Sequence, residues 1–579
     1  MSYLPETNKH YYRYFSLLAV VILGIVSILG SGGGDDGGAS APPTITMVSP
    51  AQSSDSALVT ALVTAQFSID MDPGSVTDPN NFSVVSSTGA VNASSITYDA
   101  VTDIVTFTPN ADLTSGEQYI ATISSAVQDS SGNNPLSSDY VWSFRIAPTI
   151  VPISVDSNRV MGNAPSTAAN TDATGRYVVF VSTANNLVPG ITLNSPVQIY
   201  RKDNMTGEVR LVSTDNTGLI TANLTCASPR ISDTGQYIVF TSTASNLDPT
   251  VTNTGGKSHV YLKDMNSGAI NLLDKSIVNP GEAGNGDSSL PDISGIPDTG
   301  SEKYVVFASR ATDLHADDID TFNDIFLINV VSGTVELVSV DSNEIKSDAD
   351  STAPRVTENG KRVVFESIAT NLVANDTNGQ IDIFMRNFGP DNSSSTDDDT
   401  TRISVASNGS QATGGAAGST NADISADGKF VTFQSDQPNL DSVNDINGTI
   451  TDVFMRDIDA PATSIMSVAE NGAGGDLAST HPSLSEDGRY IAFESLATTL
   501  LGAGNDTNGQ SDIFVRDKNS TTIRRVSVDN NNAQINGVST SAAISTNGRY
   551  VSLTTPYAFD TADGNGFEDI YRAYNAALP

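Results

Sequence analysis

Short apolar runs separated by polar turns make up most of the chain. Val, Ile, Phe and Tyr gather in groups of about four to seven residues, and Gly, Pro, Asn, Asp and Ser stand between the groups. This spacing is typical of strands joined by turns, and the composition is not that of a helical protein. The pattern therefore predicts an all-β fold.

One block recurs seven times beyond Pro148, and it consists of a polar turn followed by an apolar strand. The copies are TGRYVVF (174–180), TGQYIVF (234–240), SEKYVVF (301–307), NGKRVVF (359–365), DGKFVTF (427–433), DGRYIAF (487–493) and NGRYVSL (547–553). After each block come a loop, a strand beginning D-[IV]-[FY] in most copies, and a strand reading R-V-S-V or a variant of it. A period near sixty residues with three or four strands per unit predicts the blades of a β-propeller.

The polarity of the strands predicts their places within a blade. Residues 178–181 are apolar on both faces, as a strand between two neighbouring blades must be. Residues 526–528 alternate between apolar and polar, which predicts an outer strand half in solvent.

The last repeat lacks an R-V-S-V strand of its own. The segment ISVDSN, 153–158, precedes the first repeat and shares five letters with residues 339–343. We expect this segment to complete the last blade and so to remove an open sheet edge. The fold expected for 151–579 is a seven-bladed β-propeller closed by an N-terminal strand.

The repeated blocks, of the form [ST]-x-[DN]-G-[RK]-[YF]-[VI]-x-F, resemble the WD-like repeats of TolB-like propellers across 151–579. That resemblance implies either a periplasmic binding scaffold or a domain that gates a hydrolase. The chain contains no G-x-S-x-G motif.

A different unit is expected between residues 43 and 147. Seven strand-like runs fit into about a hundred residues, which is the spacing of a β-sandwich. Its opening P-x-I-x-x-V-x-P and closing W-S-F (142–144) resemble the bacterial Ig-like domains of S-layer and other surface proteins. The resemblance implies a spacer with Trp142 in its core.

The N-terminus predicts export. Basic residues precede an uncharged apolar run from Phe15 to Gly30, and we assign 1–31 as either a cleaved signal or an uncleaved membrane anchor. A Gly- and Asp-rich linker follows at 32–42. The region resembles a bacterial lipoprotein signal, except that Ser31 stands where the lipid-bearing cysteine would be. The expected location is the periplasm, the membrane or the cell surface of a bacterium.

The charge balance excludes some partners. Acidic residues outnumber basic ones 66 to 29, for a net charge of −37, so nucleic acid is excluded and membrane contact is expected only through the N-terminal segment. The scarcity of Arg and Lys also disfavours acidic sugars. The single cysteine, Cys226, has no partner for an internal disulfide and is expected to be an ordinary buried residue.

An acidic loop of the form D-x-N-G precedes the D-[IV]-[FY] strand in four blades, and a related acidic loop does so in blade three. The aligned residues of blades three to seven are Asp318, Asp320, Asp324; Asp376, Asn378, Asp382; Asp445, Asn447, Asp452; Asp506, Asn508, Asp512; and Asp563, Asn565, Asp569. In blades one and two, Gln198 and His259 occupy the place of the last acid. The blade-five loop is one residue longer than the others.

These loops allow two interpretations. Oxygen side chains at positions 1, 3 and 7 can converge on a hard cation, so calcium is one expectation, of modest affinity because the fifth-position acid and the terminal Glu of an EF-hand are missing. The other interpretation is structural, since Asn-Gly favours a tight turn and Asp caps loops.

Nothing in the sequence singles out a catalytic centre. His10, His259, His315 and His481 share no repeat position, so neither a triad nor a His-rich metal site is indicated, and we assign no catalytic or cofactor-binding residue. The acidic insertion at 391–400 is expected to be a solvated loop or a partner contact.

Two functions remain open. The favoured one is a cell-envelope scaffold that binds a protein or a glycan, and the alternative is a carbohydrate-active hydrolase or lyase with its site in the central funnel. An enzyme should gather His, Arg, Tyr and acids around the axis in a deep pocket. A scaffold should show broad loop surfaces and a narrow or water-filled tunnel.

Overall fold

The computed structural model describes residues 42–575 except 58–60, 112, 133, 147, 254–255, 296–302, 390–397 and 560–562. The expected export segment lies outside this part of the chain. Within it the single helix is α1 (Pro73–Val76), and no helix there has the length and apolar character to cross a membrane. The remaining regular structure is strand, which confirms the all-β prediction.

The first unit is a sandwich of two sheets. One sheet has the order β1 (Ile45–Ser49), β3 (Val63–Phe67), β7 (Ile104–Pro109), β6 (Ala93–Asp99), and the other β2 (Ser54–Ala57), β9 (Tyr140–Ile146), β8 (Gln118–Ile123), β4 (Phe82–Ser86), β5 (Gly89–Ala90). The seven expected runs all form strands, and β2 and β5 are additional. Trp142 is buried against Phe82, as a core residue should be.

The rest of the described chain forms seven four-stranded antiparallel sheets. The first strands are β11 (Ser166–Thr171), β15 (Cys226–Ile231), β19 (Ser288–Ile293), β23 (Ser351–Val356), β27 (Ser419–Ile424), β31 (Ser479–Leu484) and β35 (Thr540–Ile544). The second strands are β12 (Tyr177–Ser182), β16 (Tyr237–Ser242), β20 (Tyr304–Ser309), β24 (Arg362–Ser367), β28 (Phe430–Ser435), β32 (Tyr490–Ser495) and β36 (Tyr550–Thr555).

The third and fourth strands complete the sheets. The third strands are β13 (Gln198–Asp203), β17 (His259–Asp264), β21 (Asp324–Asn329), β25 (Asp382–Asn387), β29 (Asp452–Asp457), β33 (Asp512–Asp517) and β37 (Asp569–Tyr574). The fourth strands are β14 (Val209–Leu211), β18 (Ile270–Leu272), β22 (Val335–Leu337), β26 (Asp399–Arg402), β30 (Ala462–Ile465), β34 (Ile523–Arg525) and, in the last sheet, β10 (Ile150–Pro152).

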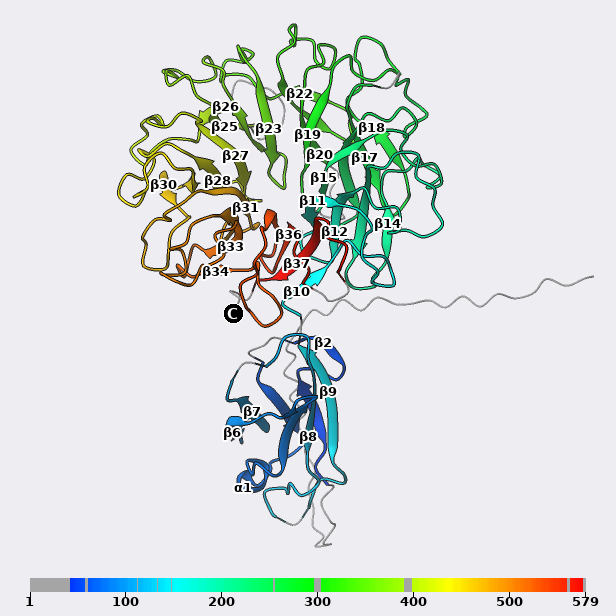
Figure 1. Ribbon diagram of the computed structural model, residues 1–579, viewed down its shortest axis with the longest axis vertical. Helices are drawn as coiled ribbons and strands as arrows, with labels where there is room; N and C mark the ends of the chain where they lie inside the picture. Colours follow the sequence, from blue (N-terminus) through cyan, green and yellow to red (C-terminus); the bar gives the residue numbers. More distant parts are fainter. Residues whose placement is uncertain are drawn as a thin grey trace, which may run out of the picture.

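The sheets, numbered blades 1 to 7 in chain order of their first strands, form a closed ring. Each blade contacts the next, and β11 of blade 1 contacts β35, β36 and β37 of blade 7. Figure 1 shows them arranged around a common centre, with the sandwich joined next to β10. The apolar clusters draw residues from two adjacent blades, so the core lies largely between sheets.

The expected closure of the ring is confirmed. β10 pairs with β37, with Pro152 opposite Tyr571, and the Ile153 N–H donates to the Ile570 carbonyl at 2.8 Å. The regular strand begins three residues before the expected ISVDSN segment, because residues 153–158 turn away to lead into blade 1. Lys202 of blade 1 fastens that turn, since its Nζ donates to the Val155 and Asp156 carbonyls.

In other blades too, the fourth strand lies just before the R-V-S-V segment that was predicted to form it. In blade 6 the fourth strand is Ile523–Arg525, and residues 526–528 follow it. These three residues are all buried, so the prediction that they lie half in solvent is wrong. Val526 instead belongs to the apolar cluster between blades 6 and 7, and Ser527 makes a buried hydrogen bond with Asp512 of strand β33.

A repeated aromatic pair fills the middle of six blades. The last aromatic of the apolar block lies opposite the aromatic of the D-[IV]-[FY] strand, and the two rings stack with centroids 5.8 to 6.0 Å apart. Phe493 and Phe514 are the pair in blade 6, in direct register across β32 and β33. The sequence motif thus encodes blade packing.

Candidate functional site

The last acid of each acidic loop belongs to a buried hydrogen-bond relay. Asp382, at the start of β25, accepts a hydrogen bond from Ser404 Oγ, and that hydroxyl accepts one from the Ile383 N–H at 3.1 Å. The same relay joins these acid and serine pairs: Asp324 and Ser339, Asp452 and Ser467, Asp512 and Ser527, Asp569 and Ser154. This acid therefore anchors the serine of the R-V-S-V segment to the third strand.

Blades 1 and 2 keep the relay with other residues. Gln198 accepts from Ser213 Oγ at 2.6 Å in blade 1. In blade 2 the acid has moved to the other partner, because His259 Nδ1 lies 2.9 Å from Asp274 Oδ2 and the Val260 N–H donates to Asp274. Blades 1 and 2 therefore lack the acid but keep the hydrogen-bond relay, with other side chains in its place.

The asparagine of the loop has a structural role as well. Asn508 Nδ2 donates to the Ile535 carbonyl at 2.8 Å, and its Oδ1 accepts from the Gln510 N–H. Asn378 and Asn565 make the corresponding pairs of contacts. These bonds tie the loop to the connection that leads into the next blade, as the turn interpretation expects.

Basic side chains lie between the acids in blades 4 and 6. Arg402 Nη1 is 3.1 Å from Asp376 and 3.3 Å from Asp382. Arg525 lies 3.2 Å from both Asp506 and Asp512. Each arginine is the first letter of an R-V-S-V or R-I-S-V segment, so the sequence contained a signal for these partners that went unrecognised.

Glutamine side chains complete the same two sites. Gln411 Nε2 donates to Asp376 at 2.8 Å, and Gln534 Nε2 donates to Asp506 at 2.8 Å and to Asp512 at 3.1 Å. The carboxylates of blades 4 and 6 are therefore paired with cationic and amide groups of the chain itself, and Asp506 Oδ2 has the Arg525 ion pair without a hydrogen bond.

Blade 3 gathers three carboxylates around a lysine. Oxygens of Asp318, Asp320 and Asp324 lie within 4.8 Å of one another. Lys346 Nζ is 2.8 Å from Asp320 and 2.7 Å from Asp324. Burial and the charge of Asp324 raise the pKa of Asp318 to about 6. The Lys346 ammonium group thus occupies the position between the carboxylates where a metal ion would bind.

Blades 5 and 7 have no such base beside their acids in the described chain. In blade 7, Asp563 accepts from the Tyr571 hydroxyl and Asp569 Oδ2 from Asn565 Nδ2 at 2.9 Å, so both acids have partners. Burial raises the pKa of Asp569 to about 6. In blade 5, Asp452 is completely buried, and burial raises its pKa to about 7 with the help of the Asp445 charge. Calcium binding at these loops stays a prediction.

The acidic insertion is only partly described. Residues 390–397 lie outside the described chain, whereas Asp398 is buried and lies 3.3 Å from the fully buried Arg386. Asp399 and Thr400 belong to β26. The end of the insertion is therefore part of the blade, and the expectation of a solvated loop is wrong for the buried Asp398 and Thr400, whereas Asp399 is exposed.

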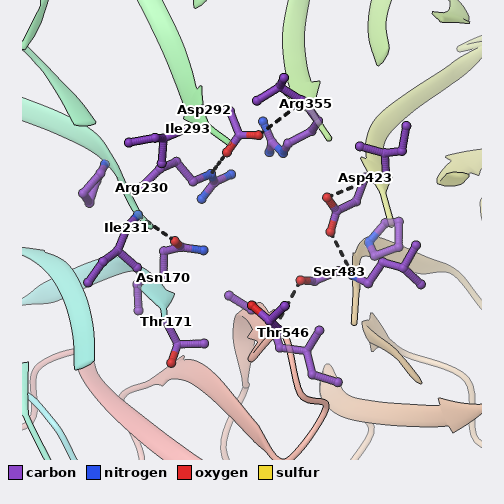
Figure 2. Close-up of a pocket in the computed structure, with 18 of the residues that line it drawn as sticks. Asn170, Thr171, Arg230, Ile231, Asp292, Ile293, Arg355, Asp423, Ser483 and Thr546 are labelled. Carbon is purple, nitrogen blue, oxygen red and sulfur yellow. Dashed lines mark hydrogen bonds and ion pairs between the residues drawn. The ribbon is translucent and has the colours of Figure 1, made fainter. Parts of the chain in front are cut away.

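A cavity of about 450 Å³ lies on the axis, lined by the first strands of all seven blades. One position of each strand contributes to a ring of different residues, shown in part in Figure 2: Asn170, Arg230, Asp292, Arg355, Asp423, Ser483 and Ala543. Sequence reasoning missed this ring, because the residue type changes from blade to blade and leaves no repeated pattern.

Side chains of the ring bond the backbone of the next blade. Asn170, Asp292, Asp423 and Ser483 accept from the N–H groups of Ile231, Val356, Leu484 and Ile544. Arg230 Nε lies 3.8 Å from Asp292. Repulsion from Arg355 and burial lower the pKa of Arg230 to about 10, and burial raises the pKa of Asp423. The ring thus helps to join the blades around the axis.

A left-handed residue precedes the ring in every blade. The third residue of each inner run has φ between 48° and 57°: Ala168, Ser228, Leu290, Ala353, Asn421, His481 and Ser541. The register of each first strand shifts at this point, as in a β-bulge. In three blades the freed N–H bonds the preceding blade, for example Ser541 N to Glu494 Oε1 at 2.7 Å.

The cavity meets only part of the expectation for an enzyme. It gathers two arginines, His481 and several carboxylates, but its described lining contains no tyrosine. A hydrogen bond that the His481 ring donates to the Glu494 carboxylate raises the pKa of His481. Burial raises the pKa of Asp233 and Glu486, which lie toward the other end. Protonatable carboxyls are thus available, although the ring's acids already hold backbone groups.

Cys226 and His315 belong to different blades and to no common cluster of reactive side chains. Cys226 is buried, and burial raises its thiol pKa to about 11, which makes it unreactive. His315 lies 3.7 Å from Asp317 in a loop of blade 3, and His10 lies outside the described residues.

Exposed apolar side chains concentrate on one face of the propeller. In an antiparallel blade, the loop between second and third strands and the connection to the next blade emerge on the same side, here called the long-loop face. It carries these exposed residues: Val160, Leu219, Ile220, Leu224, Ile277, Val278, Ile319, Phe322, Ile345, Ile368, Val443, Ile446, Leu477, Leu496 and Phe567. Among the described residues, only Met205 and Val331 are comparable on the short turns opposite.

Residues 39–146 match the model of a bacterial Ig-like domain, which confirms the interpretation of the sandwich. No curated protein matches the chain. The solved structure of TolB from Acinetobacter baumannii is similar over 76% of this chain and 79% of its own, at 14% identity and a TM-score of 0.33.

Peptidase propellers are similar at comparable levels. The β-propeller domain of the Trilobed protease from Pyrococcus furiosus aligns over 71% of this chain and 95% of that domain, with 9% identity and a TM-score of 0.40. A prolyl endopeptidase structure aligns over 73% of this chain and 52% of its own, with 10% identity and a TM-score of 0.39. Similarities at this level say nothing about what this chain binds.

Proposed function

We propose that the protein is an exported bacterial envelope scaffold whose propeller binds a protein partner through its long-loop face. The observation that carries this proposal is the concentration of exposed apolar side chains on that face, over all seven blades. Soluble proteins rarely leave such residues together without a partner to cover them. The Ig-like sandwich would act as the spacer that holds the propeller away from its point of attachment.

The rest of the molecule is consistent with this role. The carboxylates of the loops are mostly paired within the chain, and the acids of the axial ring hold backbone groups. The long-loop face therefore combines a rigid frame with apolar residues at loop tips, an arrangement that suits recognition of a preformed surface. The net charge of −37 favours a partner whose rim is basic or neutral.

A three-residue variant tests the proposal. Leu219, Ile319 and Val443 are more than four-fifths exposed on blades 1, 3 and 5, and replacing all three by Ser should leave the core unchanged. Capture of envelope proteins by the exported chain, followed by cross-linking, is expected to lose its specific partner in this variant. A double variant, Met205→Ser with Val331→Ser, changes exposed residues on the other face and should retain the partner.

Equal losses in both variants, or capture of glycans instead of protein by the wild-type chain, would contradict the proposal. The competing function, a carbohydrate-active hydrolase or lyase, is favoured by one observation, the gathering of charged side chains in the axial cavity. It predicts that release of products from a glycan mixture depends on Asp423 and Arg355 and is unaffected by the three surface substitutions.

A further inference from the structure

Blade 5 lacks the arginine and the glutamine that pair with the loop carboxylates in blades 4 and 6. Ile465 occupies the place of Arg402 and Arg525, directly before the segment M-S-V. Gly474 stands where blades 4 and 6 have a glutamine, and the Asn444 carbonyl lies 2.6 Å from the position that a Cβ there would take. The longer loop thus fills the space of the missing side chain, but it brings no positive charge.

One carboxylate oxygen of blade 5 is buried without a partner. Asp452 is 0% exposed, and its Oδ1 accepts from Ser467 Oγ at 2.6 Å as in the other blades. Its Oδ2 has no ion pair and no hydrogen bond of ordinary geometry within the described chain. The equivalent oxygen of Asp512 is reached by Gln534 and Arg525. A buried carboxylate oxygen with no donor is costly.

A second unpaired oxygen belongs to Asn447. Its Nδ2 donates to the Gly475 carbonyl at 2.9 Å, so the amide is oriented as in blades 4, 6 and 7. Its Oδ1 has no partner among the described residues, because the extra loop residue removes the N–H contact that Asn508 receives two residues along the chain. The Asn447 amide also acts on Asp452 as a weak hydrogen-bond donor and lowers its pKa, by less than burial and the Asp445 charge raise it.

Asp445 brings a second charge to the same place. One of its oxygens accepts from the Gly448 N–H at 3.0 Å. Its charge raises the pKa of Asp452, and Asp441 in turn raises that of Asp445, after the larger effect of burial in each case. No basic residue contributes to the pKa of either acid. Blade 5 therefore combines two carboxylates and an amide oxygen with no counter-charge from the described chain.

We propose that blade 5 holds a divalent cation, with Asp445, Asn447 and Asp452 as its side-chain ligands. Calcium fits best, because the ligands are all oxygen atoms on a loop and a hard cation of flexible coordination can complete its shell with carbonyls and water. Lys346, Arg402 and Arg525 perform the same neutralisation from within the chain in blades 3, 4 and 6. The inference is independent of the proposed partner.

Calcium titration of the full chain tests the site. Calorimetry at pH 7.5 is expected to show one calcium per wild-type chain and none in Asp452→Asn. Ile465→Arg should also lose binding, because the new guanidinium would lie between the acids as Arg525 does. Asp512→Asn is the matched control in blade 6 and should bind calcium as the wild type does.

Thermal melting separates the site from a general effect on folding. Calcium should raise the wild-type Tm by roughly 2–4 °C over its value in chelator. In chelator, Asp452→Asn should melt at or above the wild type because it removes an uncompensated buried charge, whereas Asp512→Asn should melt lower because it breaks an ion pair.

Three results would overturn the proposal. Binding that persists in Asp452→Asn would place calcium elsewhere, and binding lost in Asp318→Asn but not in Asp452→Asn would place it in blade 3. A wild-type Tm that is the same with calcium and with chelator would remove the site altogether.

Discussion

A buried serine is the smallest unit on which the blade depends. Ser404 Oγ donates to Asp382 and accepts from the Ile383 N–H, so one hydroxyl satisfies two groups on the third strand. Replacing it by Ala leaves both without that partner, at a cost of about 1–3 kcal/mol in the free energy of unfolding. Denaturant unfolding of Ser404→Ala measures the loss.

The neighbouring Ser410 provides the control for that experiment. It is exposed, and its printed hydrogen bonds are made by its backbone, the N–H donating to Asn408 Oδ1 and the carbonyl accepting from the Ala406 N–H, so Ser410→Ala should change stability by less than about 0.5 kcal/mol. Similar values for the two variants would argue against the relay.

At this scale the sequence predicted residue positions but not residue partners. The repeated Asp and the repeated Ser were both visible, yet they are 15 residues apart in blades 3, 5 and 6, 22 apart in blade 4 and 415 apart in blade 7, and periodicity contains no information on which residues touch. The arginines that neutralise the loops were visible too. A comparison of the copies could have identified them, because this position holds an arginine in blades 4 and 6, Ile465 in blade 5 and Pro152 in blade 7.

At the scale of elements, the turn between first and second strands couples adjacent blades. Gly488 has φ of +67°, and a Cβ there would lie 2.3 Å from the Phe430 ring of the preceding blade. The same contact joins Gly175 to Tyr550, Gly235 to Tyr177, Gly360 to Tyr304 and Gly548 to Tyr490. The glycine of the [DN]-G-[RK]-[YF] motif is thus needed both for its backbone angle and for this close approach.

Gly488→Ala is therefore expected to destabilise the protein more than a Gly→Ala substitution at a turn of similar φ without a close neighbour. Gly509 has φ of +62° and nothing within 4 Å, so Gly509→Ala should cost about 1–2 kcal/mol for its backbone alone. The clash with Phe430 should add about 1–3 kcal/mol to Gly488→Ala. Unfolding curves of both variants give the difference, and equal costs would show that the ring moves aside freely.

The closing strand is the other element with a testable cost. Ile153 is fully buried between blades 7 and 1, so Ile153→Ala should lose about 2–5 kcal/mol and speed proteolysis near the junction. Val160 follows in the same segment and is 54% exposed, and Val160→Ala should behave as the wild type. Undiminished protease resistance of Ile153→Ala would contradict a role for this segment in closing the ring.

Strand existence was predictable from sequence, whereas outer strand boundaries were not. The second and third strands are six-residue runs rich in apolar residues, such as Tyr237–Ser242 and Asp324–Asn329, whereas first strands such as Ser166–Thr171 are mostly polar. The outer strands are only three or four residues long, such as Val209–Leu211, and too short to show a period of two. The outer strand was therefore predicted at the more regular R-V-S-V segment rather than at the short strand next to it.

At the scale of the whole molecule, buried carboxyls set the response to pH. The pKa values of Asp318 and Asp569 are raised to about 6, whereas the unfolded value is about 3.9. The folded chain therefore binds more protons between about pH 4 and 6, and its free energy of unfolding falls as the pH rises through that window.

The Tm in chelator should accordingly be higher at pH 5 than at pH 7.5. The net charge of −37 acts in the same direction, because self-repulsion weakens as carboxylates are protonated. Acids with a lowered pKa, such as Asp517 at about 2, stabilise the fold at pH values above the pKa of the unfolded chain. Their contribution to stability is lost only at more acidic pH, so it does not change between pH 5 and 7.5. Differential scanning calorimetry at the two pH values checks the sign, and a Tm that rises with pH would contradict it.

The ring as a whole followed from the repeat and its missing strand, because closure is a topological requirement that a sequence can reveal. The axial ring of Arg230, Asp292, Arg355 and Asp423 did not follow, since these residues occupy one repeat position with different side chains. Differences between copies are the part of a repeat protein that its periodicity hides.

One consequence of the closure concerns mechanical force. The strand that completes blade 7, Ile150–Pro152, follows directly on the Ig-like unit, so a pull between an anchored N-terminus and a partner on the propeller would act on that strand first. Its few pairs with β37 would separate one after another from the Ile150 end rather than all together. Strong tension would thus convert the circle into an open arc before any other blade is disturbed.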